Sequence, residues 1–189
     1  YGVAVRGRAF AISRGDGSYV METVLCKIAW PAEFHAQTAV EAAMQLHDRL
    51  EALGVSIGAI ERIDIRTHEA CMRIIDKKGP LDNPADRDHC IQYMVAVPLI
   101  KGSLTAADYT DAGAADPRID ELRAKTTVKE NPRFTREYLE ADKRTIGNSV
   151  QVFFKDGSSS EKVSIDAPIG HRQRRGEGIP ILVKKFESA

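Results

Sequence analysis

The feature that most constrains the fold is a period-two pattern of apolar residues near the end of the chain. Residues 148–166 read NSVQVFFKDGSSSEKVSID, and apolar residues alternate with polar ones on both sides of Asp156-Gly157. Such alternation indicates strands with one buried face, and Asp-Gly between two of them is typical of a hairpin turn. The segment therefore predicts an antiparallel hairpin whose apolar face must be covered. The alternating apolar positions are Val150, Val152, Phe154, Val163 and Ile165.

Further periodic segments place helices between strands. Residues 36–53 repeat apolar side chains at steps of three and four, which predicts an amphipathic helix that stops at Gly54. Residues 60–67 (IERIDIRT) alternate like a half-buried strand, and residues 1–12 alternate weakly, as an opening strand would. Because strands flank a run of helices, the pattern predicts an α+β fold. We expect an antiparallel sheet that includes the C-terminal hairpin and packs against several helices.

The remaining segments predict short helices and loops. Asn83 is placed to cap a helix that begins with Pro84, where the missing N–H costs nothing. This helix is expected to run to about Lys101, with Pro98 kinking or ending it. Residues 168–180 (PIGHRQRRGEGIP) predict a basic, glycine-rich loop before a short terminal helix. Other predicted helical segments are 69–77, 105–109 and 117–125.

The composition excludes several classes of partner. The 27 Lys and Arg residues balance the 27 Asp and Glu residues, so we expect neither a nucleic-acid nor a membrane partner. No apolar run approaches the ~20 residues of a membrane-spanning helix, and the longest, 94–100, contains a proline. The chain opens with YGVAVRGRAF, without an initiator Met or a targeting segment, and we expect it to be a piece of a longer protein.

Three cysteines bear on metal binding and on location. Cys26, Cys71 and Cys90 are widely spaced and form no CxxC pair. Their odd number and spacing argue against a disulfide framework or a zinc site and favour reduced thiols in the cytoplasm. We interpret them as small buried hydrophobic residues. The sequence also lacks a phosphate loop, GxGxxG, HExxH and GxSxG, so we predict no metal site and no cofactor.

Residues 28–43 (IAWPAEFHAQTAVEAA) raise the question of function. Pro31 disfavours a helical residue before it, so we expect the chain to stay extended until the alanine-rich helix begins. Alternate residues of an extended chain point the same way, which would place Glu33, His35 and Gln37 on one face. These groups form either a polar surface or one wall of a site. In a site, His35 or Glu33 would act as an acid or a base.

Two more polar segments are candidates for anion binding. Residues 83–94 (NPADRDHCIQYM) place Arg87 and His89 in the first turn of a predicted helix, where backbone N–H groups can hold a carboxylate. Residues 170–178 (GHRQRRGEG) gather arginines, whose planar guanidinium groups bind carboxylates at two points. The alternatives are an ordinary helix start and a solvated loop. The basic residues of the second segment are His171, Arg172, Arg174 and Arg175.

Longer stretches of the chain point to a family. They read SYVMETVLCKIAWPAEFHAQTAVEAAMQL, IRTHEACMRIIDKKGPLDNPADRDHCIQYMVAVPLI, LTAADYTD and PIGHRQRRGEGIPILVKKF. Together they resemble the 2-methylcitrate dehydratase branch of the MmgE/PrpD family over nearly the whole chain. The resemblance implies that residues 1–189 are its smaller α+β C-terminal domain, and that an all-helical N-terminal domain is absent from this sequence.

The resemblance also implies a reaction and its residues. The reaction is elimination of water from 2-methylcitrate to give 2-methyl-cis-aconitate, a step of the methylcitrate cycle of propionate catabolism, without a cofactor. The enzyme would be a cytoplasmic homodimer, with its active site between the small and the helical domain. The family's lysine before the proline matches Lys27, and we predict it as a catalytic residue together with Glu33 and His35 of the polar segment. The predicted residues for binding the tricarboxylate are Gln37, Arg87, His89, His171, Arg172 and Arg174.

Other functions stay open at this point. Decarboxylation of cis-aconitate or epimerisation of a diacid would keep the family and change the reaction. A non-catalytic domain that binds an anion or mediates assembly is an alternative of another class. We expect the isolated chain to be inactive, because half of a cleft cannot exclude water from the reacting groups.

Overall fold

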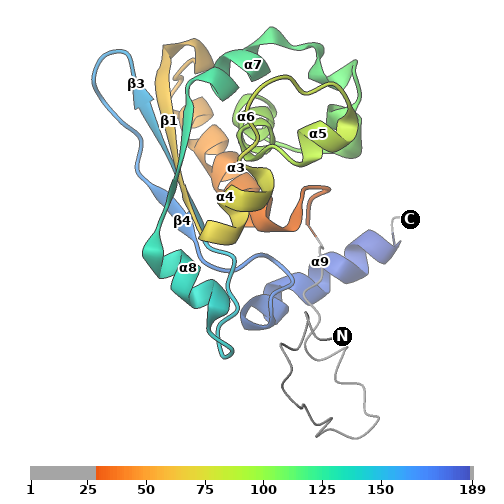
Figure 1. Cartoon of the computed structure of the whole chain (residues 1–189). Coiled ribbons are helices and arrows are strands. Elements are labelled where there is room, and N and C mark those ends of the chain that lie inside the picture. Colours follow the sequence, from red (N-terminus) through yellow and green to blue (C-terminus); the bar gives the residue numbers. More distant parts are fainter. Residues whose placement is uncertain (1–28, 188–189) are drawn as a thin grey trace, which may run out of the picture.

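A mixed four-stranded sheet is the frame of residues 29–187, the part of the chain that the computed structural model describes (Figure 1). The strand order is β2-β1-β3-β4. Strand β1 (Ile60–Thr67) pairs antiparallel with β3 (Asn148–Phe154), which pairs antiparallel with β4 (Val163–Ile165). Strand β2 (Thr126–Glu130) runs parallel to β1 at the edge. The predicted α+β class and hairpin are confirmed, but a purely antiparallel sheet was wrong.

The error lies in β2, which the sequence pattern did not reveal. Its five residues (TTVKE) bury only the first side chain and leave the last two exposed. Such a short edge strand carries almost no alternation of apolar and polar residues. In the hairpin, Gly157 has φ +85°, a conformation that glycine adopts without strain.

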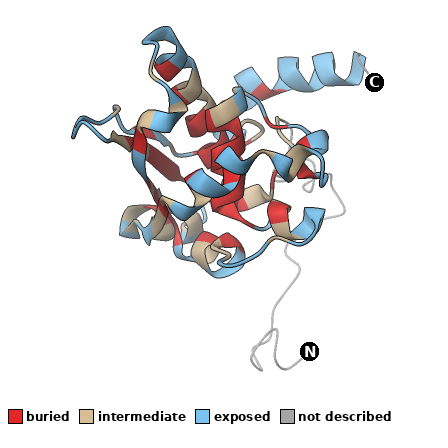
Figure 2. Cartoon of the chain, turned by 90° about the horizontal axis from the view of Figure 1, so that it is seen from above, coloured by how far each residue is buried: buried red, intermediate tan, exposed pale blue. Residues whose placement is uncertain are grey.

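Helices pack against the sheet and against one another. Helix α3 (Gln37–Ala52) packs on β3 and β4, as its predicted apolar stripe requires. Helix α6 (Ile91–Lys101) packs on α3, and α7 (Pro117–Ala124) packs on α6. Every residue from 91 to 99 is buried, so α6 forms the centre of the core. Figure 2 shows these buried helices inside a shell of exposed ones.

Short helices complete the fold; those over 69–75 and 106–109 match predicted segments, whereas the helix over 132–139 was not predicted. Asn83 caps α5 as predicted, since its Oδ1 accepts a hydrogen bond from the backbone N of Asp86 at 3.0 Å. Cys71 and Cys90 are buried as predicted, whereas Cys26 and the strand expected over 1–12 lie outside the described residues. The remaining elements are η1 (Phe34–Ala36), η2 (Ile57–Ala59), α4 (Glu69–Ile75), α5 (Pro84–Asp88), η3 (Ala106–Tyr109), η4 (Gly113–Ala115), α8 (Pro132–Leu139), η5 (Arg172–Arg174) and the longer α9 (Arg175–Glu187).

Two predicted segments differ in the structure. The helix expected over 84–101 is interrupted at Cys90, whose extended backbone separates the partly exposed α5 from α6, which is buried from residue 91 to residue 99. Pro98 lies in the last turn of α6 and does not end it. The basic loop expected over 168–180 is largely helical, because α9 continues through two glycines and Pro180. None of the helices between residues 29 and 187 combines the length and the apolar character of a membrane span.

Strand β1 offers a direct test of the core. Ile63 is fully buried in the middle of the central strand, whereas Glu61 on the same strand is exposed. Ile63→Ala should lower the free energy of unfolding by about 2–5 kcal/mol, because the deleted methyl groups leave a cavity. Urea unfolding measures the change, with Glu61→Ala as the control expected within about 0.5 kcal/mol of the unchanged chain. Equal losses in both variants would contradict the placement of β1.

Candidate active site

Glu33 and His35 lie together at the start of α3, but not on an extended segment. Residues 34–36 form a turn of 3₁₀ helix, η1, and the Glu33 side chain caps it. Glu33 Oε2 accepts a hydrogen bond from the backbone N of His35 at 2.7 Å. The prediction of an extended approach with three aligned side chains was therefore wrong from Phe34 onward. Pro31 restricts only the residue before it, and a capping carboxylate favours a helical turn.

Gln37 points into the protein instead of sharing a face with Glu33 and His35. Its side chain is almost completely buried. The Nε2 atom donates hydrogen bonds to the carbonyl oxygens of Trp30 and Ala32 at 2.9 and 2.8 Å. Gln37 thus closes the turn that precedes η1 and holds Glu33 and His35 in place.

The carboxylate of Glu33 also contacts the imidazole of His35. His35 Nδ1 lies 2.9 and 3.1 Å from the two carboxylate oxygens. Burial opposes ionisation of Glu33, but hydrogen bonds from His35 and the positive charges of His35 and His89 outweigh it and lower the pKa of Glu33. An ionised carboxylate can only accept, so Nδ1 carries the hydrogen in this pair. In the neutral ring, Nε2 then carries no hydrogen, and its lone pair can accept a proton.

Tyr138 and His68 complete a cluster around this ring. The hydroxyl of Tyr138, on α8, lies 3.4 Å from His35 Nε2. His68, directly after β1, stacks on Tyr138 with ring centroids 4.7 Å apart and approaches His35 with centroids 5.2 Å apart. Neither residue was predicted from the sequence. The one available signal was a histidine immediately after a predicted strand, because functional side chains are frequent in loops at strand ends.

His68 is held neutral beside His35. Its side chain is fully buried, and Nε2 has no hydrogen-bond partner among the described residues. Burial and the positive charge of His35 lower the pKa of His68 to about 4. The cluster therefore contains one histidine with an ionised carboxylate partner and one that stays uncharged near neutral pH. This arrangement suits His35 for proton transfer, with His68 as a neutral neighbour.

The backbone around His35 is fixed to the sheet. Asn148, the first residue of β3, donates from Nδ2 to the carbonyl oxygen of His35 and to Oγ1 of Thr38, both at 2.8 Å. Thr38 Oγ1 donates onward to the carbonyl oxygen of Ile146 at 2.7 Å. The side chains of Asn148 and Thr38 are fully buried. The position of the imidazole is thus set by β3 and not only by its own helix.

The predicted residues of the second and third segments lie apart from one another. His89 ends α5, is half exposed, and is close enough to Glu33 to lower the pKa of that carboxylate. Arg87 points elsewhere: Nη1 donates to the carbonyl oxygen of Tyr109 at 2.7 Å, and Nη2 pairs with Asp111 at 2.8 Å. Lys27 lies outside the described residues.

The basic residues near α9 are engaged in contacts within the chain. His171 is fully buried, Nε2 lies 3.0 Å from the carbonyl oxygen of Lys143, and Nδ1 accepts from the backbone of Gln173 at 3.2 Å. Arg174 binds both carboxylate oxygens of Glu41 at 2.8 Å. Arg172 donates to the carbonyl oxygens of Ala141 and Asp142. These contacts attach the start of α9 to the domain.

The cluster supports acid–base chemistry. Glu33, His35 and Tyr138 form a chain from a carboxylate through an imidazole to a phenol, so a proton can be taken up at Nε2 or supplied from the hydroxyl. Within residues 29–187, no group of three His, Cys, Asp or Glu side chains is placed to hold a metal ion.

Comparison with known proteins agrees with the resemblance seen in the sequence. The family model of the MmgE/PrpD C-terminal domain matches residues 30–189. The 2-methylcitrate dehydratases of Salmonella typhimurium and Cupriavidus necator are 59% identical over 187 and 188 residues, which is 99% and 100% of this chain and 39% of each relative. The protein from Yarrowia lipolytica named mitochondrial 2-methylcitrate dehydratase is 59% identical over 98% of this chain and 36% of its own length. The chain thus spans well under half of each relative.

The buried His68 predicts a dependence of stability on pH. Its pKa is about 4 in the folded chain and 6.5 ordinarily, so the unfolded chain binds the proton more tightly between these values. The stability contributed by neutral His68 is present above pH 6.5 and lost as the pH falls toward 4. His68→Phe keeps a ring for stacking and should reduce the loss of unfolding free energy between about pH 7 and pH 4.5 by about 2 kcal/mol. Urea unfolding at both pH values measures this, and an unchanged pH slope would contradict it.

Proposed function

This chain belongs to the MmgE/PrpD family, and we propose that it forms one wall of the active site of a 2-methylcitrate dehydratase. The observation that carries the proposal is 59% identity to proteins of that name over practically the whole chain. Since the chain spans 39% of those relatives, the rest of a longer protein would supply the other wall. The Glu33–His35–Tyr138 cluster supports the same assignment, because elimination of water requires a base and an acid.

In the proposed mechanism His35 is the base. Glu33 holds Nδ1–H and stabilises the imidazolium that forms when Nε2 removes the proton from the methyl-bearing carbon of 2-methylcitrate. The electrons of the broken C–H bond form the new double bond, and the neighbouring hydroxyl leaves as water after it receives a proton. Among the described residues, the Tyr138 hydroxyl, 3.4 Å from Nε2, is the donor in this mechanism. A residue of the missing part of the enzyme is the other possible donor.

The remaining predicted residues differ in their roles, and Arg87, which pairs with Asp111 away from the cluster, has none in this proposal. Lys27 and His89 would bind substrate carboxylates, since His89 is half exposed and lies near Glu33. Gln37, His171 and Arg174 shape the wall, because their polar atoms are bonded inside the chain. The exposed Arg172 stays a candidate for binding the substrate. A cytoplasmic location and a homodimer stay predictions of the resemblance.

Substitution of Glu33 tests the catalytic pair. In the full-length enzyme, Glu33→Gln should lower kcat for 2-methylcitrate by roughly 10²–10⁴-fold, because an amide no longer stabilises the His35 imidazolium. The matched control is Glu51→Gln on α3, since Glu51 lies 3.9 Å from His47 but is mostly exposed. Absorbance of the unsaturated product gives the rate. Equal kcat in the unchanged enzyme and in Glu33→Gln would remove the pair from the mechanism.

Chelation tests the proposal that no metal cofactor takes part. The enzyme should keep at least about 90% of its activity after dialysis against EDTA, because the proposed acid and base are side chains. Its control is the same enzyme dialysed without chelator. Activity that disappears and returns with added metal would contradict the proposal. Turnover of cis-aconitate to a decarboxylated product, without turnover of 2-methylcitrate, would assign the alternative reaction of the same family.

A further inference from the structure

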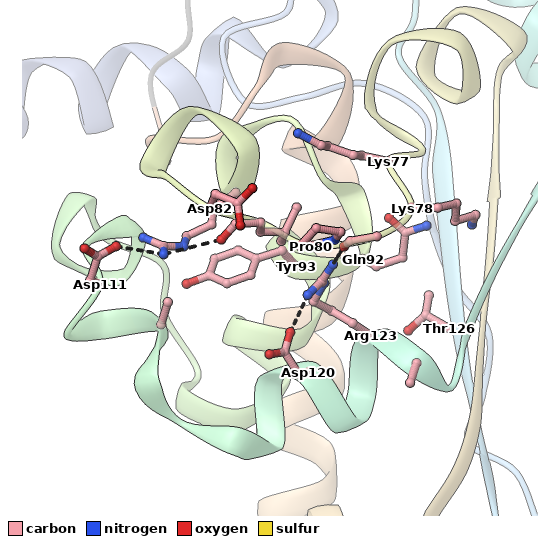
Figure 3. A pocket seen from close by; sticks show the side chains of 15 residues that line it. Lys77, Lys78, Pro80, Asp82, Gln92, Tyr93, Asp111, Asp120, Arg123 and Thr126 are labelled. Atoms are coloured by element: carbon pink, nitrogen blue, oxygen red, sulfur yellow. Dashed lines mark hydrogen bonds and ion pairs between the residues drawn. The ribbon is translucent and has the colours of Figure 1, made fainter.

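A cavity of about 730 Å³ lies apart from the Glu33–His35–Tyr138 cluster, between α7 and the loop that leads to α5 (Figure 3). Its volume lies within the ~300–1,000 Å³ that is usual for small-molecule sites. No residue of the cluster lines it. The loop residues 77–82 form one side, and Tyr93 and the α7 side chains form the other. The cavity is therefore large enough for a ligand of its own.

Two arginines from different helices reach into this cavity. Arg87, on α5, has a side chain that is only 9% exposed, and Arg123, on α7, has one that is 15% exposed. Backbone carbonyls hold both guanidinium groups: Arg87 donates to Tyr109, as described above, and Arg123 Nη2 donates to Gly79 at 2.9 Å. Because these bonds position the groups in advance, a ligand that binds them loses little side-chain entropy.

Each arginine also holds a carboxylate that comes from the solvent side. Arg87 pairs with Asp111, and Arg123 pairs with Asp120, as the dashed lines at Asp111 and Asp120 in Figure 3 show. The two aspartate side chains are 87% and 73% exposed. Pairs with such exposed carboxylates contribute little to stability and can be replaced at low cost. The pairs with Asp111 and Asp120 thus indicate that both arginines bind carboxylate groups.

One donor of the two arginines is left without a partner within residues 29–187. Arg123 Nε is buried and has no hydrogen-bond partner among the described residues. Burial raises the pKa of Tyr93 to about 12, so its hydroxyl stays uncharged near neutral pH, and Arg87 and Arg123 both lie within electrostatic range of it. Lys77 and Lys78 also line the cavity, but their ammonium groups already pair with Asp86 and Asp76.

We propose that this cavity binds a small dicarboxylate, with one carboxylate on Arg87 and the other on Arg123. The ligand takes the places that the side chains of Asp111 and Asp120 occupy in the structure. Each guanidinium group already pairs with a carboxylate of its own, so the two carboxylates of one small ligand match the two arginines. The inference does not rest on the proposed dehydratase reaction, since it uses none of the residues of that cluster.

Removal of the competing aspartates gives a test by gain of binding. Titration calorimetry of the full-length protein with succinate should show binding that becomes about threefold or more tighter in the double variant Asp111→Asn/Asp120→Asn. The matched control is Asp116→Asn, because Asp116 pairs with the exposed Arg118 and does not line the cavity. Its affinity should equal that of the unchanged protein. Unchanged or weaker binding in the double variant would overturn the proposal.

Two more measurements identify the ligand class and the site. Arg123→Met should weaken succinate binding at least tenfold, and inorganic phosphate should bind at least tenfold more weakly than succinate. Phosphate binding as tight as succinate binding would overturn the assignment to dicarboxylates. The same titration in His35→Gln should give the unchanged affinity, and loss of binding there would place succinate at the other cluster. Turnover of 2-methylcitrate in the unchanged preparation reports the proposed reaction separately.

Discussion

The side-chain amide of Asn148 joins the first residue of β3 to the turn that carries His35, and the geometry of the candidate site depends on this junction. Its Nδ2 donates to the His35 carbonyl oxygen and to the Thr38 hydroxyl inside the first turn of α3. A buried amide with partners in two elements fixes their relative position more firmly than apolar packing does. Loss of this amide would leave a buried carbonyl without a partner, which costs about 1–3 kcal/mol.

The sheet brings the other members of the cluster to the same place. His68 follows the last residue of β1, and α8, which carries Tyr138, follows β2 directly. Because β1 and β2 run parallel, both strands deliver the chain to one end of the sheet. The backbone N of Asn131 donates to the carbonyl oxygen of Thr67 at 2.7 Å and secures α8 there. The parallel edge strand, rather than the hairpin, therefore positions the phenol beside the imidazole.

Much of the scaffold follows from local patterns, and most of the site geometry does not. The alternation in 148–166, the stripe of α3 and the cap at Asn83 act over a few residues, and the structure confirms them. The contact of His35 with Tyr138 joins residues 103 positions apart, through a strand too short to show a period. The break at Cys90 depends on the packing of α6 in the core, and the start of α9 depends on the ion pair between Arg174 and Glu41. Neither contact can be read from the sequence of one segment.

Proton transfer at His35 is the central claim, and hydrogen exchange at the substrate tests it most directly. The full-length protein would be incubated with 2-methylcitrate in D₂O, and NMR would follow the proton on the methyl-bearing carbon of the recovered substrate. We predict that the unchanged enzyme replaces this proton with deuterium during reversible elimination, whereas His35→Gln does so at least roughly 100-fold more slowly. Exchange in His35→Gln at the rate of the unchanged enzyme would show that another group removes the proton.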